Sequence, residues 1–224
     1  MTIHAVVFDL DGVLIDSEQL WDEARRRVVA EHRGEWRTDA TAAMQGMSSL
    51  EWATYLHDSL GVDLPPAEIV DLVVDTLLRR YRQHLPLLPG AVDAVRRIGA
   101  RWPLGLASSS NRVAIDAVLS TARLTNAFAA TVSSEEVPRG KPAPDVYLEV
   151  VRHLQQLPRD CTAVEDSTNG IRSAVAAGLR VVVVPNRTYP PREDALADAA
   201  VVLDDLDQLT VGVVDELMSG PPRA

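Results

Sequence analysis

The chain has 224 residues, 46% of them hydrophobic, and a formal net charge of −10 at pH 7. This length suits one large domain, or a domain with an insertion, and the apolar content allows a sizeable core. The acidic balance contains no run of five like charges and no basic patch, so we expect no nucleic-acid binding.

The opening stretch MTIHAVVFDL lacks the basic start, long apolar run and cleavage site of a signal peptide. No apolar run reaches the roughly 18 residues that a membrane span needs, so no membrane partner is expected. The single cysteine, Cys161, excludes an internal disulfide and precedes a predicted strand, so we expect it to be a buried core residue. A cytoplasmic protein is the simplest expectation.

Short apolar runs alternate with amphipathic stretches along most of the chain. Strands are predicted at residues 4–10, 103–108, 127–133, 161–166, 180–185 and 199–203. Helices are predicted at residues 90–101, 111–121, 143–156, 168–178 and 205–218, each bounded by Gly, Pro, Ser, Asn or Asp. Apolar strands that alternate with helices predict an α/β fold, in which a parallel sheet is covered by helices on both faces.

Residues 16–86 interrupt this alternation. Helices are predicted at 17–31, 48–60 and 66–85, and no strand pattern occurs among them. We expect an inserted helical cap domain at residues 16–86, whose return hinge is LPLLPG (85–90). Residues 1–15 and 87–224 would then form the core domain.

The stretch VVFDLDGVLIDSE (6–18) places four carboxylates directly after a buried strand. Apolar residues run straight into Asp9 and Asp11, and Asp16 and Glu18 follow. Burying such a cluster costs several kcal/mol for each charge unless something pairs it. The segment is therefore either a solvated loop or a site built around a cation.

Further polar side chains follow the other predicted strands. In an open parallel sheet, ligands bind beyond the carboxyl ends of the strands, so these side chains are expected to meet in one crevice. They are Ser108, Ser109, Ser110 and Asn111 after the second strand, Lys141 after the third, and Glu165, Asp166 and Ser167 at the end of the fourth.

The chemistry of this set indicates phosphoryl transfer. Asp9, Asp166 and Glu165 offer hard oxygen ligands that suit Mg²⁺. Ser108 and Lys141 offer donors for phosphate oxygens, as do backbone N–H groups at a helix start. One aspartate of the DxD pair could attack phosphorus, while the other protonates the leaving group and later activates water.

Each motif also has an ordinary structural interpretation. A lone DxD is a weak signal, ASSSN is commonly a helix N-cap, and ED is commonly a solvated turn. The chain, however, has 21 arginines and a single lysine, Lys141, which stands where a compact point charge is wanted. The joint occurrence at successive strand ends favours a functional site.

Four segments resemble the four motifs of the haloacid dehalogenase superfamily: FDLDGVLIDSE, ASSS, GKPAPDVY and VEDSTNGI. The resemblance covers essentially the whole chain. It implies a Rossmann-like three-layer core with a helical cap inserted after the first strand, here at about residues 16–86.

The resemblance also implies roles for individual residues. Asp9 is similar to the nucleophile and Asp11 to the general acid/base. Asp9, the backbone carbonyl of Asp11, and Asp166 are similar to the Mg²⁺ ligands, with Glu165 in or next to that shell. The phosphate site would be formed by Ser108, Ser109 and Lys141.

Two activities of the superfamily are disfavoured by single residues. Dehalogenases lack the second aspartate of DxD, which is present here as Asp11. Phosphonatases need a Schiff-base lysine in the cap, and this cap has no lysine.

The β-phosphoglucomutases are harder to separate, because they share the cap type and all four motifs. They carry His where Trp21 stands and Arg where Ser49 stands, and that Arg holds the second phosphate of the substrate. The loop at residues 44–49 offers no cation, and losing such a contact costs about 1.5–3 kcal/mol. This difference favours hydrolysis. DSEQLWDEA and VVVVPN are similar to sugar phosphatases that act on hexitol and deoxyglucose phosphates.

The sequence thus predicts a Mg²⁺-dependent phosphatase that acts through an aspartyl phosphate on a small phosphomonoester, a sugar or sugar-alcohol phosphate. A phosphosugar mutase of the β-phosphoglucomutase type is the first alternative, and a non-catalytic binding protein is the second. Trp21 follows the DSE linker and could stack on a sugar ring, although a place in the cap core suits it equally well. We expect a monomer.

Overall fold

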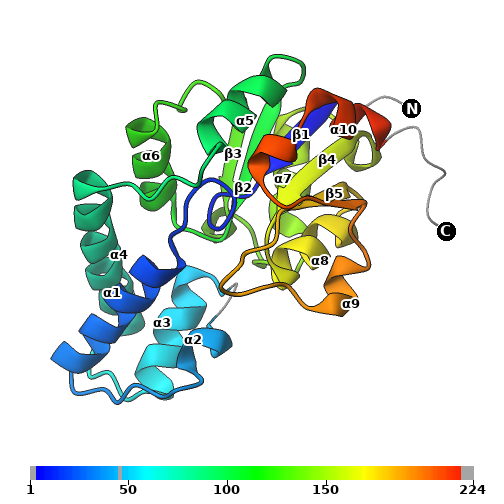
Figure 1. The fold of residues 1–224 in the computed structure, drawn as a ribbon. Helices are drawn as coiled ribbons and strands as arrows, with labels where there is room; N and C mark the ends of the chain where they lie inside the picture. Colours follow the sequence, from blue (N-terminus) through cyan, green and yellow to red (C-terminus); the bar gives the residue numbers. More distant parts are fainter. Residues whose placement is uncertain (1–3, 45–46, 218–224) are drawn as a thin grey trace.

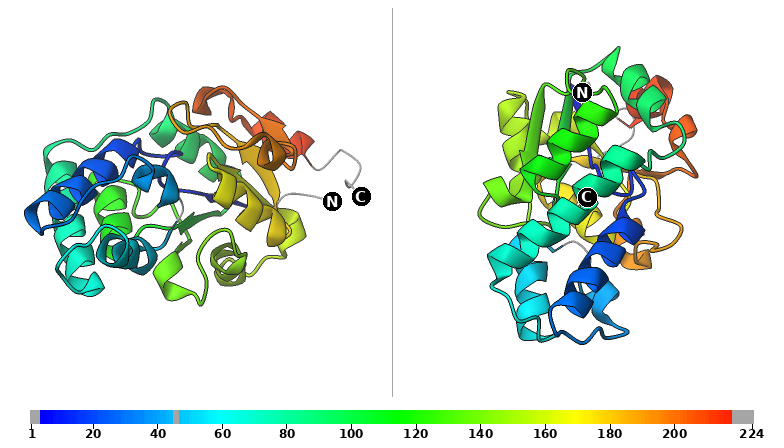
Figure 2. Two further views of the ribbon diagram at one scale, coloured as in Figure 1. Left: turned by 90° about the horizontal axis from the view of Figure 1, so that it is seen from below. Right: turned by 90° about the vertical axis from the view of Figure 1, so that its left-hand side faces the viewer.

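The computed structural model describes residues 4–44 and 47–217 and consists of a parallel sheet between two helical layers, with further helices at one end (Figures 1 and 2). The strands are β1 (Ala5–Phe8), β2 (Leu104–Ser108), β3 (Ala130–Ser133), β4 (Cys161–Glu165), β5 (Arg180–Val183) and β6 (Val201–Val202). Their order is β3-β2-β1-β4-β5-β6, and every neighbouring pair is parallel. The predicted α/β fold class is confirmed.

Alternate side chains of the central strands β1, β2, β4 and β5 serve two separate cores. Val6 and Phe8 face the helices α5 (Ala91–Gly99), α6 (Arg112–Thr121) and α10 (Val211–Glu216). Ala5 and Val7 face the helices α7 (Asp145–His153), α8 (Thr168–Ala176) and α9 (Glu193–Leu196). Because both faces are covered, the strands are apolar throughout, which is the pattern that the sequence shows. Cys161 lies fully buried in the second core, as predicted.

The prediction of one continuous helix at residues 205–218 is wrong. The chain forms a short 3₁₀ turn, Leu206–Gln208, and then α10. The side chain of Asp205 accepts hydrogen bonds from the backbone N–H groups of Asp207 and Gln208, and Thr210 Oγ1 accepts from Val213 N. Two side-chain caps within six residues therefore start two short elements instead of one long one.

The segment between β1 and α5 is helical, as predicted. It contains α1 (Glu18–Glu31), α2 (Ala40–Ala43), α3 (Ser49–Asp58) and α4 (Pro66–Gln83). Helix α4 packs against α1 and α3 and also reaches α6 of the core. The four-residue helix α2 was not predicted. Figures 1 and 2 both show these helices at the end of the molecule that is remote from the chain termini.

The chain enters and leaves this helical segment through two backbone segments that lie side by side. Asp16 N donates to Pro86 O over 2.8 Å, and Leu88 N donates to Leu14 O over 3.0 Å. The second crossing thus falls within residues 85–90, where the return hinge is predicted. The division into a core of residues 1–15 and 87–224 and a cap of residues 16–86 stays a prediction, as does any hinge motion. Within the described ranges, no helix is both long enough and apolar enough to cross a membrane.

Helix α7 packs so closely on β2 that the sheet needs a glycine there. A Cβ on Gly105 would lie 2.3 Å from Val150 Cγ1 and 3.0 Å from Leu154 Cδ1. We expect Gly105→Ala to lower the free energy of unfolding by about 1–3 kcal/mol, because the added methyl overpacks the core. Denaturant unfolding would measure this loss.

The matched control is Gly212→Ala in α10, where the new Cβ would lie 3.7 Å from Thr210 Oγ1, an ordinary contact. This substitution should cost no stability, because alanine has the higher helix propensity. Equal effects of the two substitutions would contradict the close packing of α7 on β2.

Candidate active site

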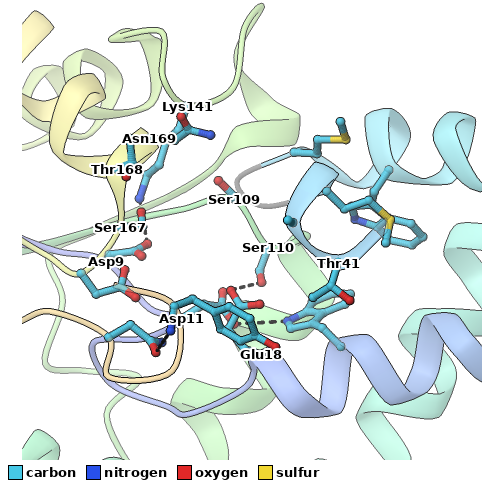
Figure 3. A pocket seen from close by; sticks show the side chains of 18 of the residues that line it. Asp9, Asp11, Glu18, Thr41, Ser109, Ser110, Lys141, Ser167, Thr168 and Asn169 are labelled. Atoms are coloured by element: carbon cyan, nitrogen blue, oxygen red, sulfur yellow. Dashed lines mark hydrogen bonds and ion pairs between the residues drawn. The ribbon is translucent and has the colours of Figure 1, made fainter. Parts of the chain in front are cut away.

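A cavity of about 340 Å³ lies where the carboxyl ends of the strands face the inserted helices. Figure 3 shows Asp9 and Lys141 on the core side of this cavity, and Glu18 and Thr41 on the side of the inserted helices. The core contributes Asp9, Asp11, Ser109, Ser110, Lys141 and Asp166, and the insertion contributes Glu18, Trp21, Arg25, Thr41, Ser49 and Trp52 among others. Most of the residues predicted at successive strand ends therefore meet here, whereas Ser108, Asn111 and Glu165 are buried beside the cavity and do not line it.

A buried charged network occupies the core side of the cavity. Lys141 Nζ donates to Asp9 Oδ1 over 2.8 Å and to Glu165 Oε1 over 2.6 Å. The hydroxyl of Tyr147 donates to the same oxygen of Glu165 over 2.7 Å, and its ring lies 5.1 Å from Lys141 Nζ. The single lysine of the chain is thus the cation that balances the carboxylates at the ends of β1 and β4.

The negative charge of this network still exceeds the positive charge. Burial, together with the Glu165 and Asp11 carboxylates, raises the pKa of Asp9 to about 8 in spite of the opposing effect of Lys141. Burial also raises the pKa of Asp166 well above its usual range, with Glu165 and Asp9 adding to the effect. Burial alone would lower the pKa of Lys141, but Asp9 and Glu165 outweigh it and raise that pKa. The site therefore favours a further cation.

The donor set fits a hard metal ion. Carboxylate oxygens of Asp9, Glu165 and Asp166 lie within 4.8 Å of one another, and all three residues are buried. Oxygen ligands of this kind suit Mg²⁺. Glu165 is already engaged, since its other oxygen accepts from the backbone N–H groups of Asp166 (3.1 Å) and Ser167 (3.4 Å). Asp9 and Asp166 are accordingly the freer ligands, with Glu165 beside them.

Two glycines make room for these carboxylates. Gly12 has φ +81°, and a Cβ there would lie 1.9 Å from Asp166 Oδ2. A Cβ on Gly170, at the start of α8, would lie 2.0 Å from Glu165 Oε1. The loop after β1 and the first turn of α8 can thus approach the acidic side chains closely.

Asp11 lies at the junction of the core and the inserted helices. Its Oδ1 accepts from Ser17 Oγ over 2.5 Å and from Trp21 Nε1 over 3.3 Å. Its Oδ2 accepts from Ser110 Oγ over 2.6 Å (Figure 3). The same oxygen accepts from Ser108 Oγ over 3.4 Å. Two donors thus come from the start of the insertion, and two from the end of β2 and the loop after it.

The serines of the ASSS segment divide into a buried one and two that face the cavity. Ser108 is fully buried, and its Oγ accepts from Ser110 N over 3.0 Å. Ser109 and Ser110 line the cavity. Asn111 caps α6, since its Oδ1 accepts from Ala114 N over 2.9 Å. Ser110 was noted in the sequence without a role and is brought to Asp11 by the structure.

Trp21 has a different environment from the one that sugar stacking requires. Only 6% of the residue is exposed, its ring packs edge-on against Trp52 at 6.1 Å, and Arg25 lies 5.2 Å from the ring centre. Little ring surface remains for a sugar, while the indole N–H points to Asp11. The structure therefore favours a role for Trp21 in holding Asp11 and not in stacking.

Sequence reasoning missed two charged or polar groups of the site. Tyr147 lies in the GKPAPDVY segment, six residues after Lys141, and its place on α7 could have suggested that it faces the strand ends. Arg25 is one of three consecutive arginines in α1, and its spacing of four residues from Trp21 and three from Val28, which places it on the apolar face of the helix, could have singled it out.

Lys141→Met should lower the free energy of unfolding by about 3–5 kcal/mol when no divalent cation is present, because it leaves buried carboxylates without their partner. Urea unfolding in the presence of a chelator would measure this loss. Arg139→Met is the matched control, since Arg139 is 70% exposed and pairs with Asp145 on the surface, and it should cost less than about 1 kcal/mol. A loss for Lys141→Met no larger than that of the control would show that Lys141 does not balance the cluster.

Several known proteins are similar to this chain. A family model described as haloacid dehalogenase-like hydrolase matches residues 3–178. Hexitol phosphatase B of Escherichia coli K12 is 35% identical over 221 residues, which cover 93% of this chain and 95% of that protein. A phosphorylated carbohydrates phosphatase of Thermotoga maritima is 31% identical over 179 residues, covering 79% of this chain and 82% of that protein.

A solved structure shows the same architecture. The crystal structure of CbbY from Rhodobacter sphaeroides in complex with xylulose-(1,5)bisphosphate superposes with a TM-score of 0.85 and 27% sequence identity. The match covers 96% of this chain and all of that chain. The alignment therefore includes the sheet, the inserted helices and the cavity between them.

Proposed function

This chain belongs to the haloacid dehalogenase-like hydrolases, and we propose that it is a Mg²⁺-dependent phosphatase that hydrolyses a sugar phosphate or sugar-alcohol phosphate through an aspartyl phosphate. The observation that carries the proposal is the pair of aspartates after β1. Asp9 lies against Lys141 on the core side, at 2.8 Å, whereas Asp11 lies against the inserted helices. The two carboxylates are thus positioned for different tasks.

In the proposed reaction, an Asp9 carboxylate oxygen attacks phosphorus and the bond to the leaving oxygen breaks. Lys141 and Ser109, which line the cavity, donate hydrogen bonds to the phosphate oxygens, and the same role for the buried Ser108 stays a prediction. Asp11 gives a proton to the leaving oxygen, and then accepts one from the water that hydrolyses the aspartyl phosphate. Mg²⁺, when bound by Asp9, Asp166 and the backbone carbonyl of Asp11 with Glu165 beside it, would offset negative charge on the transferring group.

The surroundings of Asp11 suit a group that gains and loses a proton. Ser17 and Ser110 both donate to it, and a hydroxyl can turn to accept a hydrogen bond instead. The same serines can therefore serve the ionised and the protonated carboxyl. Trp21 can only donate, and so it fixes the position of Asp11 without taking part in the exchange.

Two observations support a small carbohydrate-like substrate. The cavity of about 340 Å³ falls within the range of small-molecule sites. The similar proteins of Escherichia coli and Thermotoga maritima are named for phosphatase activity on hexitol phosphates and phosphorylated carbohydrates.

A mutase of the β-phosphoglucomutase type is the second candidate, and one observation favours it. The loop at residues 44–49 has no cation for a second phosphate, although Gln45 and Gly46 lie outside the described residues. The cavity nevertheless contains a cation on the insertion side, because Arg25 lines it from α1. A second phosphate could therefore meet a cation in this cavity even though the loop at residues 44–49 supplies none.

The remaining expectations stay predictions. They are the monomeric state, the cytoplasmic location and the lack of nucleic-acid binding. The non-catalytic alternative is disfavoured by the charged network of Asp9, Lys141, Glu165 and Asp166, since a binding protein has no need of buried carboxylates at this density.

We expect Mg²⁺-dependent release of inorganic phosphate from at least one member of a panel of hexitol, hexose and glycerol phosphates. Asp9→Asn should lower this rate by at least about 1,000-fold, because it removes the nucleophile. A phosphate assay with and without chelator measures both. Asp116→Asn, on an exposed aspartate of α6, is the control and should leave the rate unchanged.

The same panel separates the rivals. Glucose 6-phosphate formed from β-glucose 1-phosphate after priming with the bisphosphate, without net phosphate release, would establish the mutase. Neither phosphate release nor isomerisation from any substrate would favour the binding protein.

Metal binding can be tested without turnover. Mg²⁺ at about 100 times its dissociation constant should stabilise the folded protein by about 2.7 kcal/mol, seen as a rise in Tm. Asp166→Asn should remove most of this rise, yet it should not lower the Tm measured without metal, because it relieves repulsion from Glu165 and Asp9. A Mg²⁺ response that survives Asp166→Asn would place the ion elsewhere.

A further inference from the structure

Arg25 is a buried cation with an unsatisfied hydrogen-bond donor. It is 9% exposed and lines the cavity, and its Nε atom has no hydrogen-bond partner among residues 4–44 and 47–217. Its charge interacts with the carboxylates of Glu18, Asp22 and Asp11, of which Glu18 has the largest effect. Leaving a guanidinium N–H unpaired in a buried place is unfavourable. A ligand in the cavity that accepts hydrogen bonds from the guanidinium would offset this cost.

Two aromatic rings hold this side chain in place. The guanidinium carbon lies 5.2 Å from the centre of the Trp21 ring and 5.0 Å from that of Trp52. Contacts of this kind attract the cation to the aromatic faces but do not satisfy its N–H groups. The arrangement fixes the orientation of Arg25 while keeping its hydrogen-bonding capacity for another molecule.

The position of Arg25 is on the leaving-group side of the reaction. Trp21, which it contacts, donates to Asp11 over 3.3 Å, so a single side chain separates Arg25 from the proposed acid. Ser49, at the start of α3, lines the same cavity, is 2% exposed, and has an Oγ atom without a partner. Two side chains of the inserted helices that each carry an unpartnered polar atom thus face one cavity.

The charges around Arg25 favour a neutral ligand. Burial lowers the pKa of Arg25 to about 10, although Glu18, Asp22 and Asp11 act in the opposite direction, so the group is charged at neutral pH. Glu18 lines the cavity as well. One cation therefore faces several carboxylates, and a dianionic second phosphate would be repelled by them. Hydroxyl groups, by contrast, can accept from Arg25 and donate to Glu18.

We propose that Arg25 and Ser49, with Glu18, form a subsite that binds the hydroxyl groups of a polyol leaving group and does not serve a second phosphate. This inference rests on the proposed phosphatase function and specifies the part of the substrate that the inserted helices recognise. Arg25 is a specificity-determining residue in this arrangement, and Ser49 supplements it.

The test compares substrates that differ only in the proposed contacts. The probes are sorbitol 6-phosphate, sorbitol 1,6-bisphosphate, and p-nitrophenyl phosphate, which has no hydroxyl groups on its leaving group. The variants are Arg25→Met, which keeps the packing between the two tryptophans, and Ser49→Ala. The control is Arg27→Met, because Arg27 lies on the same helix but is 60% exposed and pairs with Glu31 on the surface. For each protein, kcat/KM on sorbitol 6-phosphate is divided by kcat/KM on p-nitrophenyl phosphate.

We expect this ratio to fall about 10- to 100-fold in Arg25→Met, as for the loss of hydrogen bonds from a charged donor, and less in Ser49→Ala. Arg27→Met should leave it unchanged. Because it is a ratio, a general loss of folded protein cancels out. An unchanged ratio in Arg25→Met would overturn the inference.

Two further outcomes are distinguishable. Wild-type protein that prefers sorbitol 1,6-bisphosphate, with a larger loss on that substrate in Arg25→Met, would assign Arg25 to a second phosphate and overturn the polyol subsite. Absence of Mg²⁺- and Asp9-dependent release from all three probes in the wild type would instead overturn the proposed function itself.

Discussion

The constraint on which this structure depends is the balance of buried charge at the carboxyl ends of β1 and β4. Neighbouring parallel strands bring Asp9, Glu165 and Asp166 together, and a single ammonium group, that of Lys141, pairs with two of them. An arginine would bring a larger planar group into the same place, where the Tyr147 ring and two carboxylates already surround the cation. Negative charge remains in excess after this pairing. The strand order that defines the fold therefore also creates the place where a metal ion can bind.

The two sides of the cavity carry groups with different proposed roles. The core side, formed by strand ends and the starts of helices, holds the groups proposed to act on phosphate. The inserted helices contribute Arg25, Glu18 and Ser49, which lie near the place of a leaving group. Asp11 connects the two sides, since it accepts hydrogen bonds from both. In the proposed arrangement, a change at Arg25 or Ser49 would alter which molecule is bound, whereas a change at Ser17 or Trp21 would also disturb Asp11.

The sheet and the charged groups at its edge could be predicted from the sequence. The apolar strands predict the sheet, and the Asp, Ser or Glu residues at their ends predict where ligands bind. The details that escaped prediction depend on contacts between distant residues. Helical spacing places Arg25 on the buried face of α1, but its contact with Trp52 of α3 and its place at the cavity depend on how the two helices pack. Helix α2 has four residues, too few for a periodic pattern, and the division of residues 205–218 into two elements is set by local side-chain caps.

The paired crossings between the core and the inserted helices bear on how such a protein can change over evolutionary time. Since Asp16 and Leu88 are hydrogen-bonded to Pro86 and Leu14 respectively, the two ends of the helical segment are held next to each other by the core itself. A segment of different length or shape can begin and end at the same two points without lengthening the path of the chain or disturbing the register of β1. If the inserted helices select the leaving group as proposed, exchanging this one contiguous stretch of sequence is the shortest route to a new substrate preference.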